Sequence, residues 1–163
     1  MKTEYAQHLT QANQEKELLK KTFQRLKTKK TKEVDDTFHQ LHTKAFQKMD
    51  CLACANCCKT TSPIFRDVDV KRISKHLRLK ENQFIQTYLR MDEENDYVLQ
   101  SSPCSFLAAD NTCSIYEFRP LACREYPHTD RKNMFQILDL TLKNTLICPA
   151  VAKISLEIAT KTL

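Results

Sequence analysis

Four cysteines within eight consecutive positions constrain this sequence more than any other feature. The stretch CLACANCC contains Cys51, Cys54, Cys57 and Cys58, and the remaining four cysteines are Cys104, Cys113, Cys123 and Cys148. Clustered thiolates repel one another and lose hydration, so bound cations are the simplest way to reconcile them. We therefore expect all eight cysteines to be metal ligands. The alternatives are a secreted disulfide scaffold and, for single residues such as Cys58 or Cys104, a small buried hydrophobic side chain.

The missing glycine limits the turns that this chain can form. The 163 residues include no glycine, and 41% of them are hydrophobic and 28% charged, as in ordinary globular chains. Left-handed turn positions must then fall to Asn, Asp or strained residues, and we expect Asn111 to occupy one. We expect an α+β fold dominated by helices: a small cysteine-rich metal-binding domain with short strands, preceded by a helical N-terminal extension.

The start of the chain bears on the cellular compartment, and therefore on the redox state of the thiols. The first residues lack the apolar run of a signal peptide, and no stretch reaches eighteen uninterrupted apolar residues. We expect a cytoplasmic protein without a membrane span. Thiols in a reducing cytosol are more often metal ligands or redox groups than structural disulfides.

Residues 1–49 are expected to form a basic amphipathic helical extension. Residues 14–32 hold eight Lys and Arg against two Glu, which accounts for the net charge of +6. Apolar residues at helical spacing predict two helices, broken or bent near Thr31. The basic face would contact nucleic acid, an acidic protein or a membrane surface, or else be a solvated helix face. His39 and His42 would bind metal with the cysteines or belong to a polar helix face.

Residues 50–163 are expected to form the cysteine domain, and its first half shows two short helices. The stripe of Val70, Ile73 and Leu77 gives one, with Asp67 as its N-cap, and Phe84, Ile85, Tyr88 and Leu89 give the other. A strand is predicted at Tyr97 to Leu99. Cys104 and Cys113 flank a predicted pair of short strands around a turn at Asp110 and Asn111.

The second half is read in the same way. Cys123 lies on a short helical turn between Pro120 and Pro127. The stretch MFQILDLTL, residues 134–142, reads as a strand. Cys148 precedes a final helix whose apolar residues would pack inward: Val151, Ile154, Leu156 and Ile158. Arg119 and Arg124 would donate to thiolates or a bound anion, or form ion pairs with Asp67, Glu117 or Glu125.

These residues resemble the CxxCxxCC or YkgJ-like family of cysteine-cluster proteins, described as zinc- or iron-chelating domains. The resemblance rests on CLACANCC, on PCSFLAADNTCSIYEFRPLACREYP and on the terminal CP, and spans about Cys51 to Ala150. Family members commonly carry glycine within or after the cluster and at the hairpin turn, where this chain has Ala55, Asn56, Asp110 and Asn111. The resemblance implies a metal-binding module.

Ligand spacing predicts how the sulfurs divide. Cys51, Cys54 and Cys57 have the C-x2-C-x2-C spacing of a ferredoxin, and Pro149 follows Cys148 as proline follows the fourth ferredoxin cysteine. These four would form one centre, and Cys58, Cys104, Cys113 and Cys123 a second or partial one. Zinc and a 4Fe–4S cluster both take four thiolates, so both cofactors remain open.

Three function classes follow from these patterns. The first is a metal-binding protein that holds an iron–sulfur cluster or zinc, in a redox or scaffold role. The second is an enzyme or enzyme component, such as a cluster-dependent oxidoreductase or a protein methylase, because similar cysteine clusters are found joined to protein lysine methylases. The third is a zinc-stabilised adaptor that binds nucleic acid or an acidic partner through residues 14–32.

Overall fold

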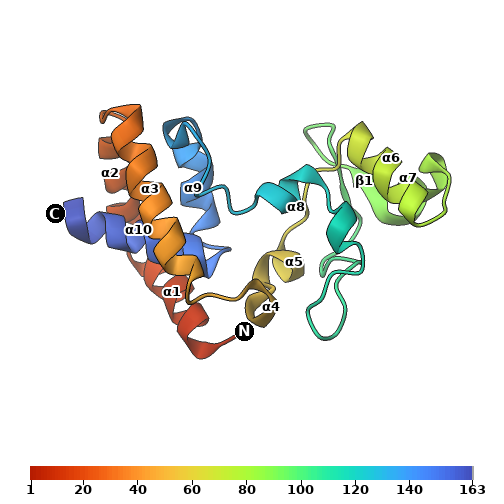
Figure 1. Ribbon diagram of the computed structural model, residues 1–163, viewed down its shortest axis with the longest axis horizontal. Helices are drawn as coiled ribbons and strands as arrows, with labels where there is room; N and C mark the ends of the chain where they lie inside the picture. The colour runs from red at the N-terminus through yellow and green to blue at the C-terminus, as the bar shows by residue number, and fades with distance from the viewer. Residues whose placement is uncertain (163) are drawn as a thin grey trace. The chain divides into compact units, whose positions relative to one another are not determined.

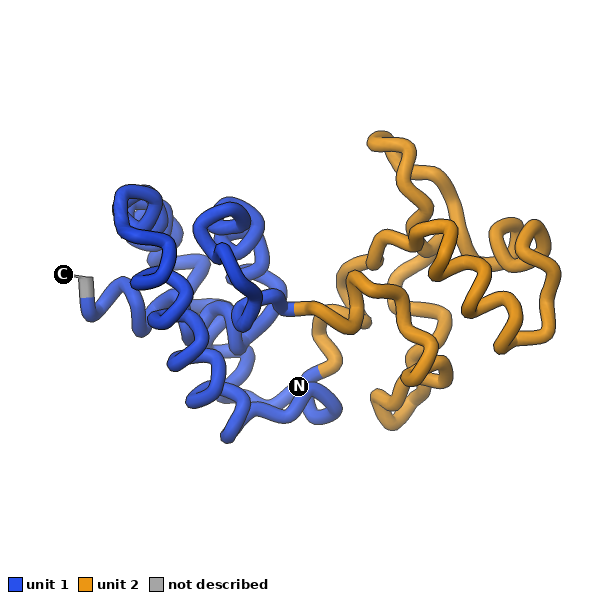
Figure 2. The backbone as a smooth tube through the Cα atoms, turned by 45° about the horizontal axis from the view of Figure 1, so that its top comes forward, with its two compact units in different colours: residues 1–54, 127–163 blue, residues 55–126 orange. Residues whose placement is uncertain are grey.

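The computed structural model describes residues 1–162, and the chain divides into two compact units (Figure 2). Unit 1 combines Met1–Cys54 with the C-terminal segment from Pro127 onward, and unit 2 is Ala55–Tyr126. The C-terminal segment thus packs with the N-terminal helices, although it follows the cysteine region in the sequence. The boundary predicted between residues 49 and 50 stays a prediction.

Unit 1 is a helical assembly. Its elements are α1 (Thr3–Gln14), α2 (Lys16–Leu26), α3 (Thr31–Phe46), α4 (Cys51–Cys54), the 3-10 helix η2 (Met134–Ile137), α9 (Leu138–Asn144) and α10 (Pro149–Thr162). Helix α10 contacts α1, α2 and α3 (Figure 1). The break predicted near Thr31 is confirmed, because α2 ends at Leu26 and α3 begins at Thr31.

Two apolar clusters hold unit 1 together. Phe23 and Phe38 meet edge to face with ring centroids 6.2 Å apart, and Ile154 and Ile158 of α10 belong to the same cluster. Ala12, Leu19 and Leu156 belong to a second cluster that joins α1 and α2 to α10. The inward packing predicted for the final helix is confirmed, since Val151, Ile154, Leu156 and Ile158 are all buried.

The strand predicted at residues 134–142 is wrong. This segment is helical, because Met134, Leu138 and Thr141 are buried at helical spacing, and Phe135 and Leu140 are exposed. A contact distant in sequence starts the helical turn: the Asp35 carboxylate of α3 accepts the N–H groups of Asn133 and Met134, both at 2.8 Å. An acidic group that caps a helical start from another element leaves no local sequence signal.

Unit 2 contains short helices and one small sheet. Its elements are α5 (Asn56–Thr60), α6 (Asp67–His76), α7 (Glu81–Tyr88), β1 (Leu89–Met91), β2 (Tyr97–Leu99), the 3-10 helix η1 (Tyr116–Phe118) and α8 (Leu121–Glu125). Strands β1 and β2 pair antiparallel, with Leu89 opposite Leu99 and Met91 opposite Tyr97. The strand predicted at Tyr97 to Leu99 is confirmed.

An aromatic cluster forms the core of unit 2. Phe84 is fully buried, and its ring centroid lies 6.2 Å from that of Phe65, 5.4 Å from that of Tyr88 and 6.3 Å from that of Phe106. Ile73 of α6 is also fully buried in this cluster. The core therefore joins α6 and α7 to the segment that follows Cys104.

Two local predictions in unit 2 need correction. Asp67 is the first residue of α6 and not its N-cap; Arg66 has that position, and the Asp69 carboxylate accepts the Arg66 N–H at 3.2 Å. The strand pair predicted between Cys104 and Cys113 is reduced to one bridge between Leu107 and Cys113. The left-handed conformation predicted for Asn111 is confirmed, with φ 67°.

The expected fold class is confirmed: the described chain is mostly helical, has a small two-stranded antiparallel sheet, and places helices before the cysteine-rich region. Over residues 1–162, none of the helices has both the length and the apolar character that crossing a bilayer requires.

Candidate metal centres

Unit 2 holds five of the eight cysteines, Cys57 and the four that we predicted to form the second centre, and all five make backbone hydrogen bonds. Cys58 lies on α5, and its carbonyl accepts the N–H of Cys104 at 2.8 Å. Cys113 forms the bridge to Leu107, whose N–H donates to the carbonyl of Cys104 at 3.0 Å. Cys123 lies on α8. We call Cys58, Cys104, Cys113 and Cys123 the unit-2 cysteines.

The unit-2 cysteines interact electrostatically. Burial and, after it, nearby charge on Cys58, Cys104 and Cys113 together raise the pKa of Cys123 to about 12. Burial also raises the pKa values of Cys104 and Cys113, and charge on Cys58 acts in the same direction on both. Four partly buried thiols are therefore close enough that charge on one opposes charge on the others.

Hydrogen-bond donors and one cation surround these sulfurs. The backbone N–H groups of Phe106 and Leu107 donate to the thiol of Cys104, and that of Ile115 donates to the thiol of Cys113. The Arg119 guanidinium lowers the pKa values of Cys58, Cys113 and Cys123. Such donors stabilise thiolates and tune metal–thiolate centres. Of the two alternatives predicted for Arg119, the structure supports an interaction with thiolates.

Cys58 differs from its neighbours because its thiolate is favoured. Its Sγ lies 3.9 Å from the Sγ of Cys57. The hydrogen bond from Cys57, together with the positive charges of Arg119 and Lys59, lowers the pKa of Cys58 to about 6, against the effect of burial. Cys58 would therefore enter a metal site already deprotonated at neutral pH. Cys57, which we predicted to belong to the other centre, is thus in contact with Cys58.

A second group of thiols lies in unit 1 and consists of Cys51, Cys54 and Cys148, the unit-1 cysteines. Cys148 immediately precedes α10, and the N–H groups of Ala150 and Val151 donate to its thiol. Burial and, after it, charge on Cys51 and Cys54 together raise the pKa of Cys148 to about 11 despite these donors. Cys148 thus interacts with two of the three cysteines that the spacing groups with it, and metal binding by this group stays a prediction.

Local contacts position α4, which carries Cys51 and Cys54. The hydroxyl of the buried Tyr5 accepts the N–H of Asp50 at 3.0 Å, and the Asp50 carboxylate accepts the N–H of Leu52 at 2.9 Å. After Cys54 the chain turns at Ala55, which has φ 49°. This is a left-handed position at which glycine would have no steric cost.

The other predicted ligands have different partners. Nε2 of His39 lies 2.8 Å from the carbonyl oxygen of Arg131, and Nδ1 of His42 lies 2.8 Å from the Thr129 hydroxyl. Both contacts join α3 to the segment before η2. They support the polar helix face that was the alternative for these histidines.

The sulfurs are near one another without forming a closed site. Within residues 1–162, no three Cys, His, Asp or Glu side chains converge closely enough to enclose a metal ion. Charges act over about 10 Å, whereas sulfurs around zinc lie roughly 3.8 Å apart, so the two observations are compatible. The donor chemistry of the unit-2 cysteines fits a four-thiolate centre, and metal binding would require the sulfurs to move closer together.

Sequence analysis missed two residues that support the unit-2 cysteines. Asp69 and Arg72 on α6 contact the backbone that leads into Cys123. An acid and a base three residues apart on a helix commonly form an ordinary ion pair, so their spacing does not point to a site. The contact partners at residues 118–121 are distant in sequence and could not be identified from the pattern.

Comparison with known proteins gives one result. No curated protein and no solved structure matches this chain significantly. A sequence profile covers most of the chain, residues 50–148, and includes all eight cysteines up to Cys148. The chain therefore belongs to the CxxCxxCC family, whose description reads "Putative zinc- or iron-chelating domain".

Proposed function

We propose that the unit-2 cysteines together bind one zinc ion or one iron–sulfur cluster, and that this centre stabilises the fold of unit 2. The observation that carries the proposal is the mutual electrostatic interaction of four partly buried thiols that come from separate segments of the chain. A cation removes the repulsion among them and allows each thiol to bind as thiolate.

A scaffold role suits the size of unit 2. Its core rests on a few aromatic and aliphatic side chains, and its sheet has two strands of three residues each. Small domains of this kind often need a metal or a disulfide because their cores supply little free energy of folding. A centre that joins α5, the Cys104–Cys113 segment and α8 would connect parts that are far apart in the sequence. Metal would bind only the folded arrangement, so its binding energy would add to the stability of the fold.

The unit-1 cysteines form the second proposed group. Three thiolates are one fewer than zinc or a cubane cluster usually takes. The C-x2-C-x2-C spacing still assigns Cys57 to this group, and that assignment stays a prediction from the sequence. The proposal also includes a reducing, cytoplasmic environment, because thiols must remain unoxidised to bind metal.

The full chain, purified without oxygen, tests the proposal. Metal analysis and an absorption spectrum identify the bound species, since zinc is colourless and iron–sulfur clusters absorb visible light. Cys123→Ser should lose the metal of the unit-2 centre, and Ala122→Ser, a matched change on the same short helix, should retain it. Exhaustive chelation of the wild type should lower the thermal midpoint and reduce the circular dichroism signal. A wild type without metal, or a Cys123→Ser variant with full metal content, would overturn the proposal.

A further inference from the structure

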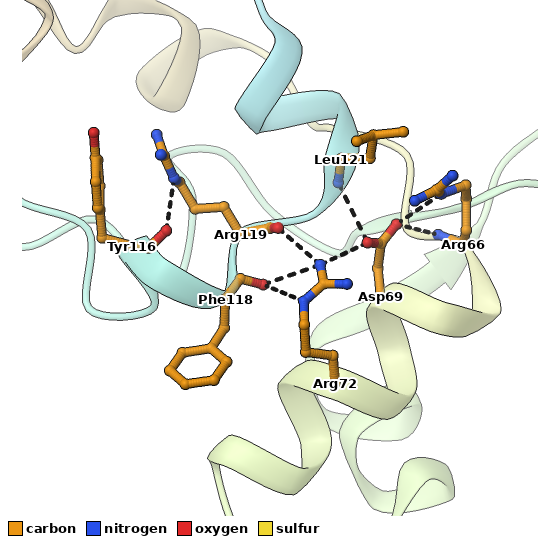
Figure 3. Close-up of polar contacts among 7 residues, drawn as sticks. All are labelled: Arg66, Asp69, Arg72, Tyr116, Phe118, Arg119 and Leu121. Atoms are coloured by element: carbon orange, nitrogen blue, oxygen red, sulfur yellow. Dashed lines mark hydrogen bonds and ion pairs between the residues drawn. The ribbon is translucent and has the colours of Figure 1, made fainter.

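The carboxylate of Asp69 is fully buried and is surrounded by donors from two directions (Figure 3). Its Oδ2 accepts Nε of Arg66 at 3.1 Å, and its Oδ1 accepts Nη2 of Arg72 at 2.7 Å. The hydrogen bonds from Arg66 and Arg72 outweigh the effect of burial and hold the pKa of Asp69 below its usual range. A buried carboxylate that is ionised and fully paired fixes the groups around it in one geometry.

The side chains of Asp69 and Arg72 also contact the segment between Cys113 and Cys123. Arg72 donates from Nη2 to the carbonyl of Arg119 at 2.8 Å, and from Nη2 and Nε to the carbonyl of Phe118 at 3.3 and 3.4 Å. Asp69 Oδ1 accepts the N–H of Leu121 at 3.3 Å. The backbone on both sides of Pro120 is therefore bound to α6.

These contacts lead directly to a proposed ligand. The carbonyl of Pro120 accepts the N–H of Cys123 at 3.0 Å. Arg72 binds the residue before Pro120, and Asp69 binds the residue after it, so the two side chains define where the first turn of α8 begins. Cys123 is part of this turn.

The contacts also orient Arg119. With its carbonyl held by Arg72, Arg119 donates Nε to the carbonyl of Tyr116 at 2.7 Å, and its guanidinium carbon lies 3.5 Å from the centroid of the Tyr116 ring. An arginine with a fixed backbone and a stacked guanidinium loses little freedom when it interacts with thiolates.

We infer that Asp69 and Arg72 are positioning residues for the unit-2 centre: they set the place of Cys123 and the orientation of Arg119 without contacting the metal. This inference rests on the proposed function. It predicts that a change in the Asp69–Arg72 pair alters metal affinity, beyond any effect on folding. Residues that orient metal ligands in this way typically contribute tenfold to a hundredfold in affinity.

Arg66 provides a matched control. It binds the same carboxylate, but none of its described contacts reaches residues 118–121. Arg66→Ala and Arg72→Ala each remove one cationic partner of Asp69, and only the second releases the segment that carries Cys123. Arg72→Lys keeps the charge but cannot bind the carboxylate and two carbonyls through one planar group. If Arg72→Ala fails to fold, Arg72→Lys and Asp69→Asn serve in its place.

The experiment uses the full-length chain and measures Zn²⁺ affinity by competition with a chelator, at a temperature at which circular dichroism shows each variant folded. Cobalt substitution gives a second readout, because its visible absorption reports the geometry of a thiolate site. Cys123→Ser identifies which bound metal ion belongs to the unit-2 centre. We expect Arg72→Ala to lower the affinity for that ion by roughly tenfold or more and to alter the cobalt spectrum. Arg66→Ala should leave both nearly unchanged.

Three other outcomes have distinct meanings. Equal losses in Arg66→Ala and Arg72→Ala would overturn the inference, because the pair would then serve only the stability of α6. Wild-type affinity in Arg72→Ala would overturn it as well, with the proposed function intact if Cys123→Ser still loses metal. A Cys123→Ser variant with full metal content would overturn both.

Discussion

Phe84 offers a way to measure how much of the stability of unit 2 comes from its core and how much from metal. Its ring is fully buried and lies against Phe65, Tyr88 and Phe106. Phe84→Ala removes this ring and leaves every cysteine in the sequence, although Cys104 and Cys113 pack against the same cluster. A substitution of a buried Phe by Ala costs about 3–5 kcal/mol in free energy of unfolding.

Metal binding is expected to contribute a similar amount. A ligand that binds only the folded state at 1,000 times its Kd stabilises by about 4 kcal/mol. Metal-loaded Phe84→Ala should therefore be about as stable as the metal-free wild type. The metal-free variant should lose both contributions, roughly 8 kcal/mol, which lies within the entire stability range of about 5–15 kcal/mol for small domains. We expect its unit 2 to be largely unfolded.

Tyrosine fluorescence during denaturation by guanidinium chloride measures this. The chain has no Trp, and four of its five tyrosines (Tyr88, Tyr97, Tyr116 and Tyr126) lie in unit 2, so the signal reports mainly that unit. Val68→Ala on α6 is the control within unit 2, because its side chain is 59% exposed and the change should cost no more than about 1 kcal/mol. If metal-free Phe84→Ala unfolded at the same denaturant concentration as its metal-loaded form, the scaffold role of the metal would be refuted.

Three further predictions concern the thiols and unit 1. In metal-free protein, Cys57→Ala should raise the pKa of Cys58 from about 6 toward the ordinary thiol value, and Cys57→Ser, which keeps a donor, should raise it less. Alkylation rates followed against pH by mass spectrometry measure this pKa. An unchanged midpoint in Cys57→Ala would contradict the prediction. The thermal midpoint of metal-free protein should be highest near pH 8.5. The pKa of Cys58 is lowered, so its contribution to the free energy of unfolding is lost as pH falls toward about 6. The pKa values of Cys148 and Cys123 are raised to about 11 and about 12, so their contributions are lost as pH rises through these values. A midpoint that rose steadily up to pH 11 would show this sign to be wrong. Asp35→Ala should destabilise unit 1 by about 1.5–3 kcal/mol, because two N–H groups lose a charged acceptor, and equal unfolding curves for variant and wild type would refute this.

Periodicity predicted α2, α3, α6, α7 and α10, because their buried residues recur at helical spacing, and it missed α1. This holds for Phe23 and Leu26 before the break at Thr31 and for Ile154 and Ile158 in α10. It failed at residues 134–142, where the side chain of the N-cap residue Asn133 makes no cap hydrogen bond and the Asp35 carboxylate supplies the cap from α3. Short apolar runs cannot be assigned by composition when the deciding contact is distant in sequence.

The candidate ligands were identifiable from the sequence, because clustered cysteines have few other uses in a reducing environment. The supporting groups were not. The N–H groups that donate to Cys104 and Cys148 depend on the local backbone, and the contact of Arg72 with residues 118 and 119 depends on how η1 and α8 pack on α6. These features follow from tertiary structure and leave only weak patterns in the sequence.

X-ray absorption at the edge of the bound metal tests the central claim most directly, because it reports the identity and distance of the ligands. The wild-type chain, loaded with the metal it carries after anaerobic purification, should show a first shell of sulfur at about 2.3 Å. Cys123→Ser should lose sulfur from this shell or lose the metal itself, and Ala122→Ser should match the wild type. A first shell dominated by nitrogen or oxygen would contradict a centre built from Cys58, Cys104, Cys113 and Cys123.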